Sequence, residues 1–340
     1  MRFRQSRDRA AGISSAIEGG RTSRRRLAAG IAFTVVTLVV CVLLGRRLTS
    51  TSWPLERAHM GLVGGAVTLY FASYVLRALG WQKLFPADGR PDRSRCLAAC
   101  GAAAASGVIL PFRLDYLVKI ATLRRMHGVK LGLEAIALSI ISLGLVDAVA
   151  FLPLSISATA TSSSVFRAPL ILVVLFGVGA CGVLVWGRHL GRLPFVARRA
   201  RLSRWAKRAA DHSGGATRDA IAAWFFLLGC WTTRAAGSML LLASLGIGFS
   251  PTLALIVLCL AAAAALIPIT SGGAIANVGA TAAILLALGV HRQQAINFSL
   301  ASGLLLSTTA AAAAVVGLAT SFTSRRLARL PAGPWRPDAH

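Results

Sequence analysis

The segment that decides the fold reads Cys259-Leu-Ala-Ala-Ala-Ala-Ala-Leu-Ile-Pro268-Ile-Thr-Ser271-Gly272-Gly273. A second segment of the same kind reads Cys100-Gly-Ala-Ala-Ala-Ala-Ser-Gly-Val-Ile-Leu-Pro111-Phe-Arg113-Leu-Asp115. In each, an alanine-rich apolar run meets a proline, which the interior of a helix does not accommodate. In a membrane protein, irregular backbone at depth occurs only where it is buried in protein or lines a polar cavity. A pair of such breaks therefore predicts a site at membrane depth.

The composition indicates an all-α integral membrane protein. Of the 340 residues, 56% are hydrophobic and only 14% are charged, a balance outside that of soluble domains. The net charge of +26 comes from basic residues placed between apolar runs, which favours membrane topology and contact with anionic lipid over nucleic acid. The six cysteines lie in or beside apolar stretches and are typical of small buried residues, so neither a metal nor another cofactor is expected.

Apolar runs close to the length that a bilayer needs, roughly 20 residues, predict six full transmembrane helices. They cover residues 27–45, 58–81, 131–155, 168–187, 219–245 and 296–320. Three shorter apolar pieces lie at 96–112, 251–268 and 274–290, so that hydropathy alone would count about eight spans. We expect one polytopic membrane domain over 27–320, between basic tails at 1–26 and 321–340.

The distribution of lysine and arginine predicts how these pieces thread through the membrane. The segments that hold 30 of the 37 basic residues are 1–26, 81–95, 113–130, 187–218 and 321–340. They all become cytoplasmic, as the positive-inside bias requires, if 96–112 dips in from the cytoplasm and 251–290 dips in from outside. We therefore expect six spans plus two re-entrant broken elements, with both termini cytoplasmic and the protein in the cell membrane. Entry from opposite faces is the pattern of an inverted-topology repeat, although alanine-rich runs that end in proline also recur by chance.

The second broken element predicts a phosphate-binding turn. Pro268 ends one half-helix, Gly272 and Gly273 allow a sharp turn, and Ser271 is a candidate N-cap for a half-helix that begins near Ala274. The N-terminus of such a half-helix presents free N–H groups and a partial positive charge, which suit the phosphate of a lipid headgroup. The alternative is a kinked hairpin with a purely structural role.

The first broken element carries charged side chains after Pro111. Arg113 is a candidate phosphate ligand because its planar guanidinium can bind two oxygens, and Asp115 and Lys119 are four residues apart on a helix, where they can pair. The alternative is that these residues only extend to the membrane surface from a cytoplasmic helix end.

Three charges fall inside predicted spans. Arg77 is close to the cytoplasmic end of its span, so we expect it to reach the surface. Asp147 and Arg234 lie deeper, in different spans, where an ionisable residue usually faces the interior or a partner. An ion pair between Asp147 and Arg234 is the simplest arrangement that satisfies both, either as a structural contact or as part of a polar path.

The sequence contains none of the familiar hydrolase, ATPase or metalloprotease motifs, and no catalytic residue is assigned. This disfavours an enzyme, although it does not exclude a transferase that acts on lipid-linked substrates.

Two motifs carry a family resemblance. Leu110-Pro-Phe-Arg-Leu-Asp-Tyr-Leu-Val-Lys119, followed by Leu123-Arg-Arg-Met-His-Gly128, resembles the first motif of the lysylphosphatidylglycerol synthase transmembrane-region family of flippase-like proteins. Leu266-Ile-Pro-Ile-Thr-Ser-Gly-Gly273, followed by Leu288-Gly-Val290 and Ala295, is similar to its second motif. The resemblance covers about 27–320, since the order and spacing of both motifs agree.

The resemblance implies an all-helical membrane protein that handles polar lipids. Two carboxylates of the family pattern are missing, because its Gly-Glu pair falls on Asp115 and Tyr116 and its later glutamate on Val278. No soluble aminoacyl-transferase domain accompanies the motifs in these 340 residues, so lipid aminoacylation is not implied. We expect a flippase-like transporter of an anionic phospholipid or a lipid-linked phosphate. The alternatives are a membrane transferase with a polyprenyl-phosphate donor and a non-transporting envelope scaffold.

Overall fold

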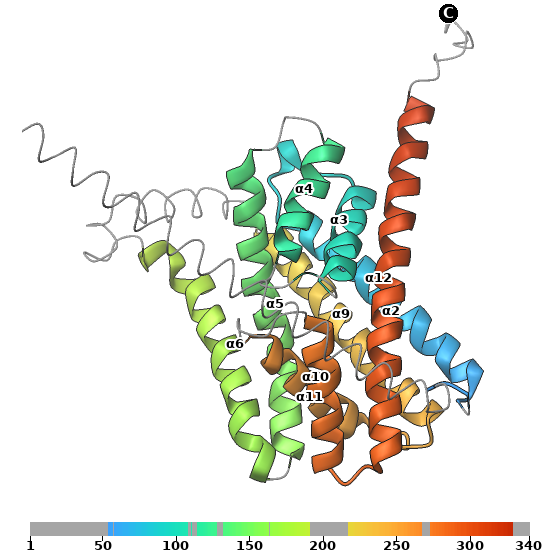
Figure 1. Ribbon diagram of the computed structural model, residues 1–340. Helices are drawn as coiled ribbons and strands as arrows, with labels where there is room; N and C mark the ends of the chain where they lie inside the picture. The colour runs from blue at the N-terminus through green and yellow to red at the C-terminus, as the bar shows by residue number, and fades with distance from the viewer. Residues whose placement is uncertain are drawn as a thin grey trace, which may run out of the picture.

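The structure is a computed structural model, and it describes residues 54–56, 58–107, 110, 114–127, 132–162, 164–190, 217–266 and 273–328. This part of the chain is helical throughout (Figure 1). Five of its helices are long and apolar enough to cross a membrane. They are α2 (Met60–Lys83), α5 (Leu133–Thr161), α6 (Ser164–Leu190), α9 (Thr217–Ser244) and α12 (Arg292–Ala328). A short 3-10 helix, Ala87–Gly89, follows α2.

The five long helices confirm five of the six predicted spans, with ends that differ by a few residues. The largest difference is at α12, which continues past the predicted end at residue 320 to Ala328. The sixth predicted span, 27–45, and the tail at 1–26 lie outside the described residues.

The two broken elements are pairs of short helices. The first consists of α3 (Arg93–Ser106) and α4 (Asp115–His127), and the second of α10 (Pro251–Leu266) and α11 (Gly273–Ala287). The partners in each pair pack against one another. The first element differs from the expectation in one respect, because its returning arm is the charged helix α4 and not part of 96–112. The physical reason is that Arg124 and Arg125 lie in the last turn of α4, and basic side chains are accommodated at a membrane surface.

Helices α2 and α9 are antiparallel, which places the two broken elements at opposite ends of the bundle (Figure 1). The N–H of His59, before α2, donates to the carbonyl of Ser244 at the end of α9 over 3.1 Å. At the other end, Lys83 Nζ lies 3.3 Å from Asp219 Oδ1 in the first turn of α9. Because α3 follows α2 and α10 follows α9, the two elements begin at opposite ends.

The order of helices repeats along the chain. Helices α9, α10, α11 and α12 begin 157, 158, 158 and 159 residues after α2, α3, α4 and α5, respectively. The packing repeats as well, since α3 packs on α12 as α10 packs on α5, and α2 contacts α12 as α9 contacts α5. With opposite chain directions, this constant offset defines an inverted-topology repeat, to which α6 is an addition.

The crossing of α2 and α9 confirms the repeat residue by residue. A Cβ atom on Gly80 would lie 3.3 Å from the carbonyl oxygen of Ala223 and 3.1 Å from Leu227 Cγ. A Cβ atom on Gly237, 157 positions further on, would lie 3.4 Å from the carbonyl oxygen of Ala66 and 2.9 Å from the Tyr70 ring. Ala223 and Leu227 follow Ala66 and Tyr70 by the same 157 positions, so the two contacts are related by a local twofold axis.

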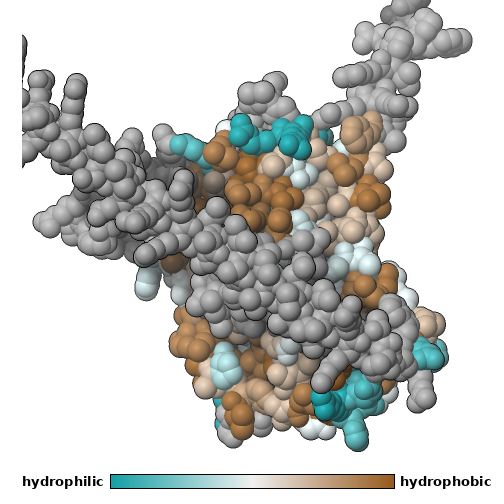
Figure 2. Space-filling view, in the orientation of Figure 1, coloured by the Kyte–Doolittle hydropathy of each residue, from teal (hydrophilic) through white to brown (hydrophobic). Residues whose placement is uncertain are grey.

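The outer surface is apolar along the length of the bundle. Helix α6 exposes large hydrophobic side chains, with Val165 76% and Leu172 68% accessible, as expected for a helix that faces lipid. On the face shown in Figure 2, hydrophilic residues gather towards the two ends of the bundle and hydrophobic residues lie between them. These features support a multi-pass membrane protein.

Candidate functional site

A polar stripe runs along the inner face of α2. Its residues, at positions 70, 73, 74, 77 and 81, follow the helical repeat of three and four residues and therefore share one face of the helix. Each makes a side-chain hydrogen bond to another element: Tyr70 to Ser238, Ser73 to Arg234, Tyr74 to the Leu306 carbonyl, Arg77 to Asp147 and Trp81 to Ser139. The stripe joins α2 to α5, α9 and α12 through polar groups at membrane depth.

The centre of the stripe is an ion pair between α2 and α5. Arg77 Nη2 lies 2.6 Å from Asp147 Oδ2, and Trp231 Nε1 of α9 donates to Asp147 Oδ1 over 2.8 Å. The side chains of Arg77 and Asp147 are 24% and 13% exposed. Asp147 is the middle residue of α5, so its charge is far from both ends of the helix and both of its oxygens are engaged.

Two expectations about these charges were wrong. In the described part of the chain, the ion-pair partner of Asp147 is Arg77 and not Arg234. Arg77 does not extend to the surface, because α2 turns it inward onto α5. The physical reason is that position along a span predicts depth only, whereas the rotation of the helix about its axis decides which neighbour a side chain meets.

Arg234 also lies close to Trp231, which donates to Asp147. Its Nε donates to Ser73 Oγ over 3.1 Å, and its Cζ lies 5.1 Å from the centroid of the Tyr74 ring and 5.4 Å from that of Trp231. The Cζ of Arg77 is 6.0 Å from the Trp231 ring. Two guanidinium groups therefore share one aromatic neighbour at depth, with a single carboxylate beside them.

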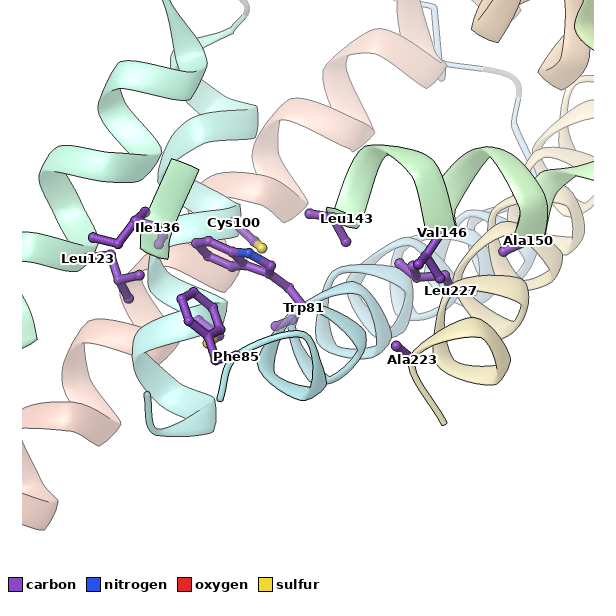
Figure 3. Packing of buried hydrophobic residues seen from close by; sticks show 13 residues of the cluster. Trp81, Phe85, Cys100, Leu123, Ile136, Leu143, Val146, Ala150, Ala223 and Leu227 are labelled. Carbon is purple, nitrogen blue, oxygen red and sulfur yellow. The ribbon is translucent and has the colours of Figure 1, made fainter. Parts of the chain in front are cut away.

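A third cation extends the stripe towards the first broken element. Lys119 of α4 is buried, with 6% of its surface exposed, and its Nζ lies 4.0 Å from the centroid of the Trp81 ring. Trp81 itself packs among Cys100, Leu123 and Ile136, which come from α3, α4 and α5 (Figure 3). Lys119 faces Trp81, so the expected pairing of Asp115 with Lys119 is wrong.

The remaining predicted site residues lie at or beside the two breaks. Asp115 begins α4 and Gly273 begins α11. Pro111 and Arg113 of the first break, and Pro268, Ser271 and Gly272 of the second, are outside the described residues.

Sequence reasoning missed that Arg77 and Arg234 correspond. Each is the eighteenth residue of its helix, and each opens the sequence Arg-Ala-x-Gly, at Arg77-Ala-Leu-Gly80 and Arg234-Ala-Ala-Gly237. The signal was present, because the two copies lie 157 residues apart, the same separation as Pro111 and Pro268.

The fold and the charged stripe define a multi-pass integral membrane protein built on an inverted repeat. The chain matches the family described as "Lysylphosphatidylglycerol synthase TM region" over residues 26–314, and it belongs to that family. Membership connects the protein with membrane lipids. No curated protein and no solved structure matches the chain.

Proposed function

We propose that the protein is a flippase-like transporter that moves an anionic phospholipid or a lipid-linked phosphate between the leaflets of the cell membrane. The observation that carries the proposal is the inverted repeat with one broken hairpin in each half. Two half-bundles of opposite orientation can rock about their shared crossing, here α2 on α9, and so present one site to either side of the membrane.

The charges at depth support an anionic lipid as the substrate. Arg77, Arg234 and Lys119 outnumber the single carboxylate of Asp147 among the stripe and its neighbours. Excess positive charge in a span is costly unless an anion compensates it, and a lipid phosphate reaches this depth with its acyl chains still in the bilayer. Arg113 and the start of α11 at Gly273 are further candidate phosphate ligands in this proposal.

The transferase alternative receives less support. It requires a carboxylate that accepts a proton, and Asp147 is the deep candidate. Both of its oxygens already accept a hydrogen bond, one from Arg77 Nη2 and one from Trp231 Nε1, so the carboxylate is engaged in contacts between helices.

The orientation is part of the proposal. Helix α4 and the C-terminal end of α12, whose sequences carry basic residues, lie at the same end of the bundle (Figure 1), and we infer that this end is cytoplasmic, together with both termini. Labelling of single cysteines on a cysteine-free background tests it, and external labelling near Arg124 would reverse the orientation.

Transport is tested by reconstituting the purified protein in vesicles that carry a fluorescent phosphatidylglycerol in both leaflets. If dithionite bleaches only the outer half of the fluorophore, as in protein-free vesicles, the protein does not move this lipid. We expect bleaching to exceed half, and a matched zwitterionic fluorescent lipid shows whether movement depends on the anionic headgroup.

A further inference from the structure

Because of the inverted repeat, each residue of one half can be compared with the equivalent residue of the other half. Arg77 and Arg234 are both eighteenth residues, of α2 and α9. Tyr74 and Trp231 are both fifteenth residues of the same two helices. Each arginine lies over the aromatic residue of the opposite helix, Arg77 over Trp231 and Arg234 over Tyr74. The local twofold axis therefore relates two arginine sites.

The two arginine sites differ in one group. On the Arg77 side, α5 contributes Asp147 as its fifteenth residue, and Trp231 Nε1 donates to that carboxylate. On the Arg234 side, the fifteenth residue of α12 is Leu306. The Tyr74 hydroxyl donates there to the Leu306 carbonyl over 3.2 Å. The donor from the opposite helix is present in both sites, but among the described residues a carboxylate is seen only beside Arg77.

Within the part of the chain that the structure describes, Arg234 is consequently a deep cation without the anionic partner that Arg77 has. Among the described residues its hydrogen-bond partner is Ser73, a neutral hydroxyl, and that bond uses only Nε. Arg234 is of intermediate burial, and no hydrogen bond of its Nη atoms to another described residue is seen. Stacking on Tyr74 and Trp231 compensates a desolvated guanidinium only in part, because a ring quadrupole is weaker than a full negative charge.

We propose that the Arg234 guanidinium binds the phosphate of an anionic lipid headgroup, at the position that Asp147 occupies relative to Arg77 in the other half of the repeat. The phosphate supplies the negative charge that Asp147 provides beside Arg77 and that its counterpart, Leu306, does not provide beside Arg234. The planar guanidinium offers its two Nη groups to two phosphate oxygens, which is the preferred geometry of arginine for this anion. The inference rests on the proposed lipid-handling function and names the residue that would hold the headgroup.

The matched pair of variants is Leu306→Asp and Leu306→Asn. The aspartate places in the second half the carboxylate that Asp147 provides in the first, so it competes with the lipid for Arg234. The asparagine has nearly the same shape and no charge. Binding of dihexanoyl phosphatidylglycerol to the detergent-purified protein is followed by the fluorescence of Trp231, whose ring centroid is 5.4 Å from Arg234 Cζ. Trp231→Phe identifies the part of the signal that comes from this residue.

We expect Leu306→Asp to weaken this binding by about tenfold or more, and Leu306→Asn to change it much less, as the charge of the new group decides the outcome. Arg234→Gln should also weaken binding of dihexanoyl phosphatidylglycerol by about tenfold. This second variant keeps the proposal testable if Leu306→Asp does not fold. Equal binding by Arg234→Gln and the wild type would overturn the proposal.

Two further probes separate the sources of the phosphate. Dihexanoyl glycerol, which has the chains without phosphate, should not compete. Inorganic phosphate should compete weakly, and competition as strong as that of the lipid would show a free-anion site and overturn the lipid assignment. Transport is measured separately, so Arg234-dependent binding without lipid movement would sink the proposed function alone, and lipid movement with Arg234-independent binding would sink this inference alone.

Discussion

The crossing of α3 on α12 and the crossing of α2 on α9 use glycine in different ways. At the first crossing, a Cβ atom on Gly317 would lie 2.6 Å from the carbonyl oxygen of Ser94, and one on Gly101 would lie 2.6 Å from that of Ala310. The backbones of α3 and α12 are therefore in direct contact at this crossing. At the second, Gly80 and Gly237 approach the opposite helix less closely, and side chains of Leu227 and Tyr70 lie between.

The difference between the two crossings shows that tight packing and polar side chains lie in separate parts of the bundle. The α3–α12 crossing is lined by alanines such as Ala98 and Ala313 and gains its stability from close packing, as small-residue contacts do in membranes. The α2–α9 crossing is less tight at its glycines, and its two helices carry Arg77, Arg234 and Trp231. The first crossing fixes a broken hairpin to a span, and the second leaves room for a charged site.

The largest effect is expected at the tight crossing. Gly317→Ala should destabilise the protein by about 3 kcal/mol, the upper range for overpacking, because the new methyl group meets the backbone of α3, which cannot move aside as a side chain can. Thermal unfolding in detergent measures it. The matched control is Gly179→Ala on α6, where a Cβ atom meets nothing within 4 Å.

The control should be neutral or stabilising by up to about 1 kcal/mol, as expected when glycine is replaced in an open helix position. If Gly317→Ala unfolds at the same temperature as Gly179→Ala, the distinction between the two crossings is lost.

The next effect concerns the ion pair at the polar crossing. Asp147→Asn keeps an acceptor for Trp231 Nε1 but removes the charge beside Arg77, and we expect a loss of about 2 kcal/mol, below the value for a fully buried pair because both side chains are partly exposed. The comparison is with Asp92→Asn, whose 3.2 Å pair with Arg95 is at an exposed carboxylate. A larger loss for Asp92→Asn would contradict the central role of Asp147.

A smaller effect isolates the hydrogen bond from α9 to Asp147. Trp231→Phe removes the Nε1–H donor but keeps a ring that can still pack against Phe151, whose centroid is 4.4 Å away. We expect Trp231→Phe to lower the free energy of unfolding by about 1.5 kcal/mol, as for the loss of a hydrogen bond to a charged group. Trp224→Phe is the control, since its ring packs edge-on against Phe225. The interpretation fails if the two variants are equally stable in a chemical denaturation series.

Most of the fold followed from the sequence. Hydropathy located α2, α5, α6, α9 and α12, the prolines at 111 and 268 marked the breaks between α3 and α4 and between α10 and α11, and the charge bias indicated that the broken elements are re-entrant. These features depend on burial along one dimension, the depth in the bilayer, which a sequence records directly.

The site followed only in part, because contacts between helices depend on rotation and on the partner. The sequence identified Asp147 and Arg234 as deep charges, but it could not show that α2 turns Arg77 onto Asp147. Likewise, the spacing of Asp115 and Lys119 allowed a pair, whereas in the folded bundle α4 packs on α3 and Lys119 lies over the Trp81 ring. Aligning the two halves on the 157-residue separation of Pro111 and Pro268 also aligns the two Arg-Ala-x-Gly sequences, and this alignment identifies Arg234 as the counterpart of Arg77.

The smallest effect tests how Arg234 is positioned at the polar crossing. Ser73→Ala removes the hydroxyl that accepts from Arg234 Nε and also donates to the Tyr70 carbonyl over 2.7 Å. We expect a loss of stability below about 1 kcal/mol, because the guanidinium keeps its aromatic neighbours and other donors. Ser155→Ala is the control, as that hydroxyl is also buried but donates only to the Leu152 carbonyl of its own helix. The two variants should therefore be similar in stability, while Ser73→Ala alone weakens binding of dihexanoyl phosphatidylglycerol, by a factor of about three. Unchanged binding in Ser73→Ala would mean that the site does not need Ser73 to orient Arg234, and the α2–α9 crossing would then differ from the α3–α12 crossing in packing alone.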